Sequence, residues 1–226
     1  MGDRRIFVLF GAATAFLAAI PAVYSVIKRS WKHQRVQIQY PSSQFIIAAG
    51  AIPFQFDAAG TPKRVLLAYH TKRNQWLLSK GRKDEGEDLA TTATREIFEE
   101  TGYPCRLHRV PMLPTCAPPP NLLPEAGIQP HSARLAENSS EPFMVTLRPI
   151  GFDMLKLIFW YIGAVDVPYD GEDGDAISAV QPGTHQLAEG FGKVKLWDIS
   201  DALEVLSFEG DKELVRTAIG ILTPKA

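Results

Sequence analysis

The longest apolar segment of the chain runs from Ile6 to Ile27 without a charged residue. A helix over this segment is long enough to cross a bilayer core of about 30 Å. Basic residues follow it at Lys28, Arg29, Lys32 and Arg35. By the positive-inside tendency they keep the remainder of the chain in the cytosol. The pattern therefore predicts a single-pass membrane anchor over residues 1–35; a cleaved signal, an organelle-targeting presequence and a soluble cytoplasmic protein are the alternatives.

After a polar linker at residues 36–43, apolar runs alternate with turn residues. The runs are rich in β-branched and aromatic residues, which favour strands. Within the first run, Gly50 indicates either a bulge or a close approach of another backbone. The expected strands are 45–49 with 51–54, 64–69, 75–78, a weak one at 106–110, 143–147, 156–167 and 194–197.

Helical spacing occurs at two places in the same region. Leu89, Ala93 and Ile97 recur every fourth residue and predict an amphipathic helix over residues 88–101. Near the C-terminus, residues 199–208 begin a helical region. Asp211 is then expected to cap a helix that ends near Leu222. Strands and helices together indicate a mixed α and β domain at residues 44–222.

Residues 111–142 interrupt this domain with many prolines, including Pro118, Pro119 and Pro120. Such a composition disfavours a helix or a central strand, so a long irregular insertion is expected. An uncommitted surface loop is the simpler interpretation, and a cover over the substrate is the alternative. Further along, residues 166–175 form an acidic loop. One of its carboxylates is a candidate metal ligand: Asp170, Glu172, Asp173 or Asp175.

Composition narrows the function classes. The 24 basic and 25 acidic residues leave a net charge of −1, which gives no support for nucleic-acid binding through a basic surface. At 226 residues and 46% hydrophobic content, the chain can bury one substantial core. Cys105 and Cys116 are too few for a disulfide framework, which fits a reducing compartment.

Charged residues are concentrated on the helix expected at 88–101. Glu96, Glu99 and Glu100 share one face, and like charges so placed repel by roughly 0.2–0.5 kcal/mol per pair. A divalent cation between them removes that cost, and oxygen ligands favour Mg²⁺ or Mn²⁺. In the preceding loop, a glycine and three cations suit close contact with phosphate: Lys80, Gly81, Arg82 and Lys83. This pattern indicates hydrolysis of a phosphoanhydride by metal-assisted water.

The spacing G-x5-E-x7-R-E-U-x-E-E-x-G-U, where U is a bulky apolar residue, resembles the signature of the Nudix hydrolases. The chain fills it with Gly81, Glu87, Arg95, Glu96, Ile97, Glu99, Glu100, Gly102 and Tyr103. Tyr103 departs from the pattern, because an aliphatic residue is usual there. The resemblance implies a Nudix-type α/β/α sandwich: a mixed sheet with the motif helix on one side and the C-terminal helix on the other.

The same resemblance implies roles for the motif residues. Glu96, Glu99 and Glu100 would bind the metal, helped by a main-chain carbonyl at Lys80 or Gly81. One of the glutamates, Glu96 or Glu99, would act as base. Arg95 would orient glutamates by pairing with Glu87 or Glu99. Substrate phosphate would be bound by Lys80, Arg82 and Lys83, and the motif would be supported by Glu87 and Gly102.

The expected reaction is Mg²⁺-dependent hydrolysis of a small diphosphate compound, for example a dinucleoside polyphosphate. The Lys80-Gly81 step and the C-terminal LSFEGDKELV stretch resemble diadenosine polyphosphate and diphosphoinositol polyphosphate hydrolases, in which Pro-Lys-Gly is usual; Ser79 replaces that proline here. A diphosphoinositol polyphosphate hydrolase is therefore one alternative. The alternative from a different class is a membrane-tethered, non-catalytic module that binds a nucleotide or a partner, whose usual mark is a damaged motif. The substrate and the oligomeric state do not follow from the sequence.

Overall fold

The computed structural model describes residues 38–113, 135–169 and 184–224. The described residues from Ser42 onward belong to one compact unit. The apolar run at residues 6–27 and the acidic positions 170–175 lie outside the described residues, so the anchor and the late metal ligand stay predictions. In the part of the chain that is described, no helix is both long and apolar enough to span a membrane.

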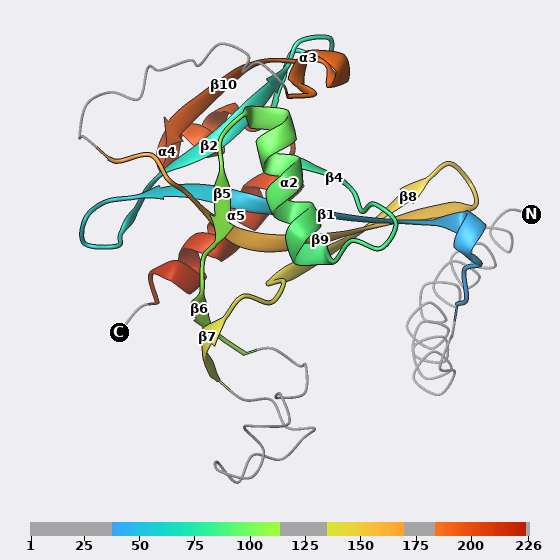
Figure 1. Ribbon diagram of the computed structural model, residues 1–226, viewed down its shortest axis with the longest axis horizontal. Coiled ribbons are helices and arrows are strands. Elements are labelled where there is room, and N and C mark those ends of the chain that lie inside the picture. Colours follow the sequence, from blue (N-terminus) through green and yellow to red (C-terminus); the bar gives the residue numbers. More distant parts are fainter. Residues whose placement is uncertain (1–37, 114–134, 170–183, 225–226) are drawn as a thin grey trace, which may run out of the picture. The chain divides into compact units, whose positions relative to one another are not determined.

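The described residues form a mixed eight-stranded sheet (Figure 1). Its centre is β1 (Phe45–Phe56), which runs parallel to β9 (Met154–Val165) and antiparallel to β2 (Pro62–His70) and β4 (Lys80–Arg82). The other strands extend the sheet on either side. On β2 these are β3 (Gln75–Leu77) and β10 (Phe191–Asp198), and on β9 they are β5 (Cys105–Leu107) and β8 (Met144–Ile150). The mixed sheet expected from the sequence is confirmed.

The strand β1 is continuous through Gly50, and its register shifts later, between Gln55 and Phe56. Of the two expectations for Gly50, the bulge is wrong and the close approach is confirmed. A Cβ at this position would lie 2.5 Å from the main-chain oxygen of Ser79 and 2.7 Å from the Cβ of Lys80. A glycine is needed here so that the short strand β4 can lie against β1.

Helices cover both faces of the sheet (Figure 1). On one face, α2 (Leu89–Thr101) buries Ala93 and Ile97 against Ala49 and Ala51 of β1. On the other, α4 (Ile199–Val205) and α5 (Glu209–Leu222) pack on the alternate residues of β1, among them Ile52. Successive side chains of a strand point to opposite faces, so one strand supports both layers. The expected α/β/α sandwich is confirmed.

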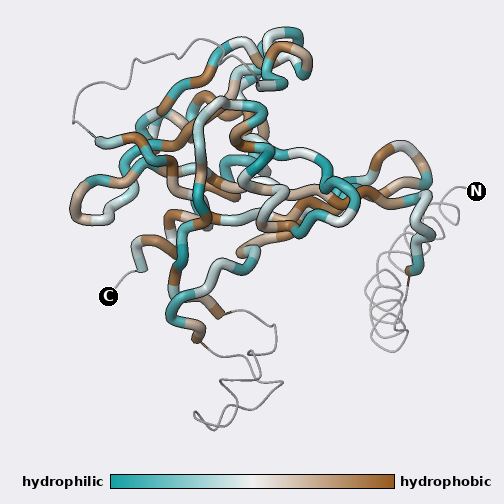
Figure 2. The backbone as a smooth tube through the Cα atoms, viewed as in Figure 1, coloured by the Kyte–Doolittle hydropathy of each residue, from teal (hydrophilic) through white to brown (hydrophobic). Residues whose placement is uncertain are grey.

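Local signals fix α2 at both ends. The Asp88 side chain caps its start by accepting a 2.8 Å hydrogen bond from the Thr91 main-chain N–H. Gly102 ends it with φ of 76°, a left-handed conformation that glycine adopts without strain. The loop between β4 and α2 is hydrophilic, whereas the central strands are largely hydrophobic (Figure 2). The helix α2 spans Leu89–Thr101, so the range of residues 88–101 predicted from the sequence was correct to within one residue.

The prediction for the last helix was wrong at its start. Phe208 is the N-cap of α5, and the main-chain N–H of Lys212 bonds to the Phe208 carbonyl at 3.1 Å. Asp211 therefore lies inside the first turn, where it is partly buried, instead of capping the helix. Leu214 and Ala218 are buried as their spacing predicts.

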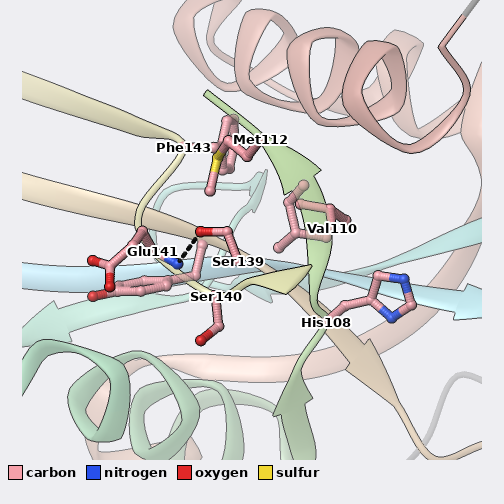
Figure 3. Close-up of a pocket in the computed structure, with 9 residues that line it drawn as sticks. His108, Val110, Met112, Ser139, Ser140, Glu141 and Phe143 are labelled. Atoms are coloured by element: carbon pink, nitrogen blue, oxygen red, sulfur yellow. Dashed lines mark hydrogen bonds between the residues drawn. The ribbon is translucent and has the colours of Figure 1, made fainter. Parts of the chain in front are cut away.

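The expected irregular insertion at residues 111–142 is structured at both ends. β6 (Val110–Met112) pairs antiparallel with β7 (Ala136–Ser139) in a separate two-stranded sheet, and residues 114–134 lie outside the description. The expected strand 106–110 is consequently divided between β5 and β6. At the junction with the main sheet, Ser139 Oγ accepts a 3.3 Å hydrogen bond from the Glu141 N–H (Figure 3). The side chains around it leave no space for a water molecule.

Candidate active site

Two buried carboxylates of α2 meet the backbone of β4. Glu100 Oε2 accepts a 3.2 Å hydrogen bond from the Lys80 main-chain N–H. Glu96 lies against Gly81, where an added Cβ would come within 1.8 Å of Glu96 Oε2. Gly81 is itself held in the sheet opposite Ala49 of β1. The strand β4 therefore fixes both carboxylates, and the bare backbone of Gly81 makes room for one of them.

Arg95 holds the other glutamates of the motif in place. Its Nε donates to Glu87 Oε1 at 2.8 Å, and its Nη2 donates to Glu87 Oε2 at 3.0 Å and to the Arg82 carbonyl at 2.9 Å. Its Nη1 donates to Glu96 Oε1 at 2.9 Å and to Glu99 Oε2 at 2.8 Å. Both expected partners, Glu87 and Glu99, are therefore bonded, and Glu96 joins them. The hydrogen bonds from Arg95 lower the pKa of Glu87 to about 2.

A third carboxylate comes from α3 (Gln186–Glu189), outside the motif. Glu96, Glu100 and Glu189 each offer one oxygen, and these three atoms all lie within 4.8 Å of one another. The short helix α3 is tied to α2 because Gln186 Nε2 donates to the Glu100 carbonyl at 3.2 Å. Sequence reasoning missed Glu189; its one local signal is Gly190, which follows it with φ of 90° and ends the helix.

The electrostatics of this trio fit a divalent cation. Burial raises the pKa of Glu100 to about 8 and also raises the pKa of Glu96, because a charged carboxylate loses its hydration there. Glu189 adds a further negative field to both. Three convergent oxygen donors with this excess of negative charge match the ligands preferred by Mg²⁺ and Mn²⁺. Glu96, Glu100 and Glu189 thus form a group that would hold the ion. Glu99, which was also expected to bind the metal, lies outside this group and accepts a hydrogen bond from Arg95.

A pocket of about 420 Å³ opens beside the trio. Of the three cations expected to bind phosphate, Arg82 lines it. Lys80 and Lys83 are not among its lining residues, and Lys83 Nζ donates instead to the Asp84 carbonyl at 2.9 Å. Glu99 also lines the pocket, with 23% of its side chain exposed. The remaining charged or titratable lining residues are Asp84, Arg95, Glu96, Lys156, His185 and Glu189.

Lys156 is the second residue that sequence reasoning missed. It lies on β9, directly opposite Ile46 of β1, and is half-buried. Its signal in the sequence is a charge inside an otherwise apolar strand, in the run KLIFWYIGAV. A charge at a half-buried strand position usually has a functional or pairing reason. The pocket thus combines carboxylates on α2 and α3 with cations on β4 and β9.

Comparison with known proteins identifies the domain. A family model described as NUDIX domain matches residues 45–121. The chain carries a NUDIX domain. The matched span contains the complete motif from Gly81 to Tyr103, including the three motif carboxylates Glu96, Glu99 and Glu100. The matched residues thus carry the complete signature of the Nudix hydrolases within a NUDIX domain.

Solved structures similar to the chain include an Ap4A hydrolase from C. elegans, with 17% identity, a TM-score of 0.46, and 79% of this chain and 99% of that chain covered. The NUDIX domain of Shewanella oneidensis NrtR, complexed with ADP ribose, has 19% identity, a TM-score of 0.48, and 82% and 95% covered. A NUDIX family hydrolase from Clostridium perfringens has 16% identity, a TM-score of 0.45, and 78% and 95% covered. The NUDIX domain is identified by the family-model match and the motif, not by these structures.

Proposed function

We propose that the protein hydrolyses a phosphoanhydride bond in a nucleoside diphosphate-linked or related compound, for example a dinucleoside polyphosphate, with Mg²⁺ or Mn²⁺ as cofactor. One observation carries this proposal. The oxygens of Glu96, Glu100 and Glu189 converge within 4.8 Å, and the same pocket is lined by the cations Arg82 and Lys156. Opposite charges so arranged suit a diphosphate bound between a metal ion and basic side chains.

Each of these residues has a separate role in the proposed reaction. A divalent ion held by Glu96, Glu100 and Glu189 would neutralise phosphate charge and make bound water more acidic. Glu99 lines the pocket and is held by Arg95, so it is placed to take the proton of the attacking water. The water oxygen bonds to phosphorus as the bridging P–O bond breaks, and the leaving phosphate ester departs with the bridging oxygen and the electron pair of that bond. Arg82 and Lys156 bind the phosphate oxygens.

The sequence also allows two alternative functions. A diphosphoinositol polyphosphate hydrolase would use the same carboxylates on a different substrate. A non-catalytic binding module, tethered at a membrane, would bind a nucleotide or a partner without turnover. The intact set of Glu96, Glu99 and Glu100, together with Glu189, supports catalysis over this second alternative.

The test measures the phosphate-ester products formed from a panel of nucleoside diphosphate-linked and polyphosphate compounds, separated by chromatography, with and without Mg²⁺. Glu96→Gln and Glu99→Gln are each expected to lower kcat by about 10²–10⁴-fold, the usual contribution of a general base or an essential carboxylate. Glu204→Gln, an exposed glutamate on α4, is the matched control and should behave as wild type. Unchanged product formation in both variants, or product formation that does not depend on Mg²⁺, would remove these carboxylates from the mechanism.

We also propose that residues 6–27 attach the protein to a membrane, with the NUDIX domain in the cytosol. The support is the uncharged apolar run and the basic residues that follow it. A fusion of residues 1–35 to a fluorescent reporter should give a membrane pattern. A diffuse signal throughout the cell would end this proposal.

A further inference from the structure

The strands β1, β9 and β8 carry an apolar surface beyond the end of α2. Directly opposed residues of neighbouring strands point to the same face of a sheet, and so do alternate residues of one strand. Two successive rows across β1, β9 and β8 contain only apolar residues: Phe45, Leu155 and Pro149, then Ile47, Leu157 and Leu147. These residues are called the apolar sheet face below.

The apolar sheet face continues the surface on which α2 packs, but α2 does not cover it. Ala49 and Phe159 come next along the same side of the sheet, and they pack with Ala93 of α2. On the apolar sheet face itself, the residues of β1 and β9 are only partly buried, and Leu147 of β8 is 60% exposed. Within the part of the chain that the structure describes, none of them joins a hydrophobic core cluster. The β8–β9 hairpin extends past α2 at the end of the sheet where β1 begins (Figure 1).

The turn that joins β8 to β9 adds a protruding aromatic side chain. Residues 151–153 form this turn, and the side chain of Phe152 is fully exposed. Hydrophobic positions follow the strands of the same hairpin (Figure 2). Arg148 and Asp153, which flank the tip, have opposite charges, so the tip carries no excess of either sign. A large aromatic side chain left in water forgoes the free energy of its burial, so this hairpin is suited to contact an apolar partner.

The course of the chain indicates which partner that is. The compact unit begins at Ser42, and Phe45, the first residue of β1, belongs to the apolar sheet face. The uncharged apolar run ends at Ile27, so residues 28–41 join it to the domain. A fully extended segment of this length spans at most about 50 Å. With residues 6–27 in a bilayer, as proposed above, the apolar sheet face stays within that distance of the lipid surface.

Such a tether favours the lipid surface over other partners. It makes docking intramolecular in effect, so a weak interfacial contact becomes a stable one. Interfacial binding grows with the apolar area buried and with attraction of basic residues to anionic lipids. The tether supplies four basic residues: Lys28, Arg29, Lys32 and Arg35. A second copy of the chain fits less well, because Pro149 has no N–H with which β8 could pair to another strand.

We propose that the apolar sheet face and Phe152 dock the NUDIX domain on the surface of the membrane that holds residues 6–27. This inference rests on the proposed membrane attachment and extends it from a flexible tether to a fixed orientation of the domain. Phe152 enters the boundary between headgroups and acyl chains, and Leu147 and Leu157 lie against it. Lys156, next to Leu157, points to the opposite face by strand alternation and lines the active-site pocket. Docking and the pocket therefore use opposite faces of β9.

A photo-crosslinking experiment identifies what Phe152 contacts. The amino acid p-benzoylphenylalanine replaces Phe152 in the full-length protein, which is reconstituted with vesicles of phosphatidylcholine and phosphatidylserine. Irradiation followed by mass spectrometry should give adducts with lipid. The matched control carries the same amino acid in place of Phe98 on α2, a phenylalanine that is 45% exposed and lies outside the apolar sheet face, and it should give far fewer lipid adducts. Adducts with residues 6–27, with a second copy of the chain, or with lipid equally at both positions would overturn the inference.

A substitution measures the contribution of the hairpin tip. With p-benzoylphenylalanine in place of Leu147, Phe152→Ser should lower the yield of lipid adducts by up to about tenfold, because burial of one large apolar side chain is worth at least that factor. Phe98→Ser is the matched control and should leave the yield unchanged. An unchanged yield in Phe152→Ser would also overturn the inference. Phe152 is fully exposed, so its replacement leaves the core intact, and unfolding midpoints check this for every variant.

Extraction with alkaline carbonate separates this inference from the proposed anchor, because it strips peripheral proteins from vesicles and leaves membrane-spanning ones. Protein that resists extraction but forms no lipid adducts at position 152 would refute the docking face and keep the anchor. Protein that is extracted, yet forms lipid adducts at position 152 before extraction, would refute the anchor and keep the docking face. Protein that does neither would refute both.

Discussion

Because Gly81 has no side chain, Glu96 can pack against β4 in the candidate active site. The position is part of β4, and its backbone faces the buried carboxylate of Glu96. Any Cβ there would overlap all the carboxyl atoms of Glu96, the nearest at 1.8 Å. Because Glu96 belongs to the trio with Glu100 and Glu189, a displacement of its side chain disturbs the whole ligand set.

We therefore expect Gly81→Ala to abolish most activity while the fold survives. Moving a catalytic group by about 1 Å costs on the order of 10²-fold in rate, and the methyl group forces at least such a movement. Steady-state kinetics and a Mg²⁺ titration measure the effect. Gly220→Ala is the control: nothing lies within 4 Å of its added Cβ, and alanine in a helix is favoured over glycine by about 0.5–1 kcal/mol. Wild-type activity in Gly81→Ala would refute this role.

The residues of the candidate site could be predicted only where they lie close together in the sequence. Glu96, Glu99 and Glu100 lie within about one turn of the same helix, so helical spacing alone brings them to one face. Glu189 and Lys156 belong to α3 and β9, which are brought near β4 by sheet pairing and by long-range contacts such as that of Gln186. No spacing rule connects such distant positions, and both residues were missed.

Among the elements, α3 was the hardest to predict from the sequence, although it carries Glu189. It is a single turn, too short for a hydrophobic period, and its N-cap His185 makes no side-chain capping bond. It is attached by the buried Gln186, which donates to the Glu100 carbonyl, and by the Gly190 carbonyl, which accepts hydrogen bonds from the main-chain N–H and the hydroxyl of Thr71. By contrast, α2 has a capping Asp88, a terminating Gly102 and an apolar stripe, so the sequence predicted it well. The strand β7 was missed because its partner β6 lies across the prolines of the insertion.

Gln186→Ala should detach α3 from α2 and weaken the metal site without removing a ligand. Loss of such a supporting hydrogen bond typically lowers metal affinity by about 10–100-fold. The expected result is a higher Mg²⁺ concentration for half-maximal activity, with much of the activity recovered at saturating Mg²⁺.

Leu187→Ala on the same turn is the matched control, because that side chain is 70% exposed. It should titrate with Mg²⁺ as wild type does. An unchanged Mg²⁺ requirement in Gln186→Ala would mean that α3 is held in place by other contacts.

At the scale of the whole molecule, the proposed metal site lowers the stability of the folded protein when no ion is bound. Glu100 is buried, and its pKa is raised to about 8 from an ordinary 4.5. Between these values the unfolded chain releases the proton and the folded protein keeps it. Stability rises with pH only where the unfolded state binds more protons, so this group lowers stability as pH rises toward 8.

The metal-free protein should therefore lose thermal stability between about pH 6.5 and 8, the upper part of the window set by the raised pKa of Glu100. Saturating Mg²⁺, which binds the ionised carboxylate, should reduce that loss, since a ligand of the folded state stabilises it. Glu100→Gln has no proton to release and should flatten the profile in EDTA. Differential scanning calorimetry at several pH values makes the comparison; a wild-type profile parallel to that of Glu100→Gln would contradict the assignment.

The parallel pairing of β1 with β9 joins residues 45–54 to residues 155–164 across most of the domain. During synthesis, the motif helix and β4 therefore leave the ribosome well before the strand that completes the sheet beneath them. Contacts of such long range form late, because a large loop must close first. A nascent chain that stops short of Met154 would contain every motif residue and yet have no Lys156, no α3 and no closed pocket, so catalytic competence arrives only after β9 has docked and α3 has followed it.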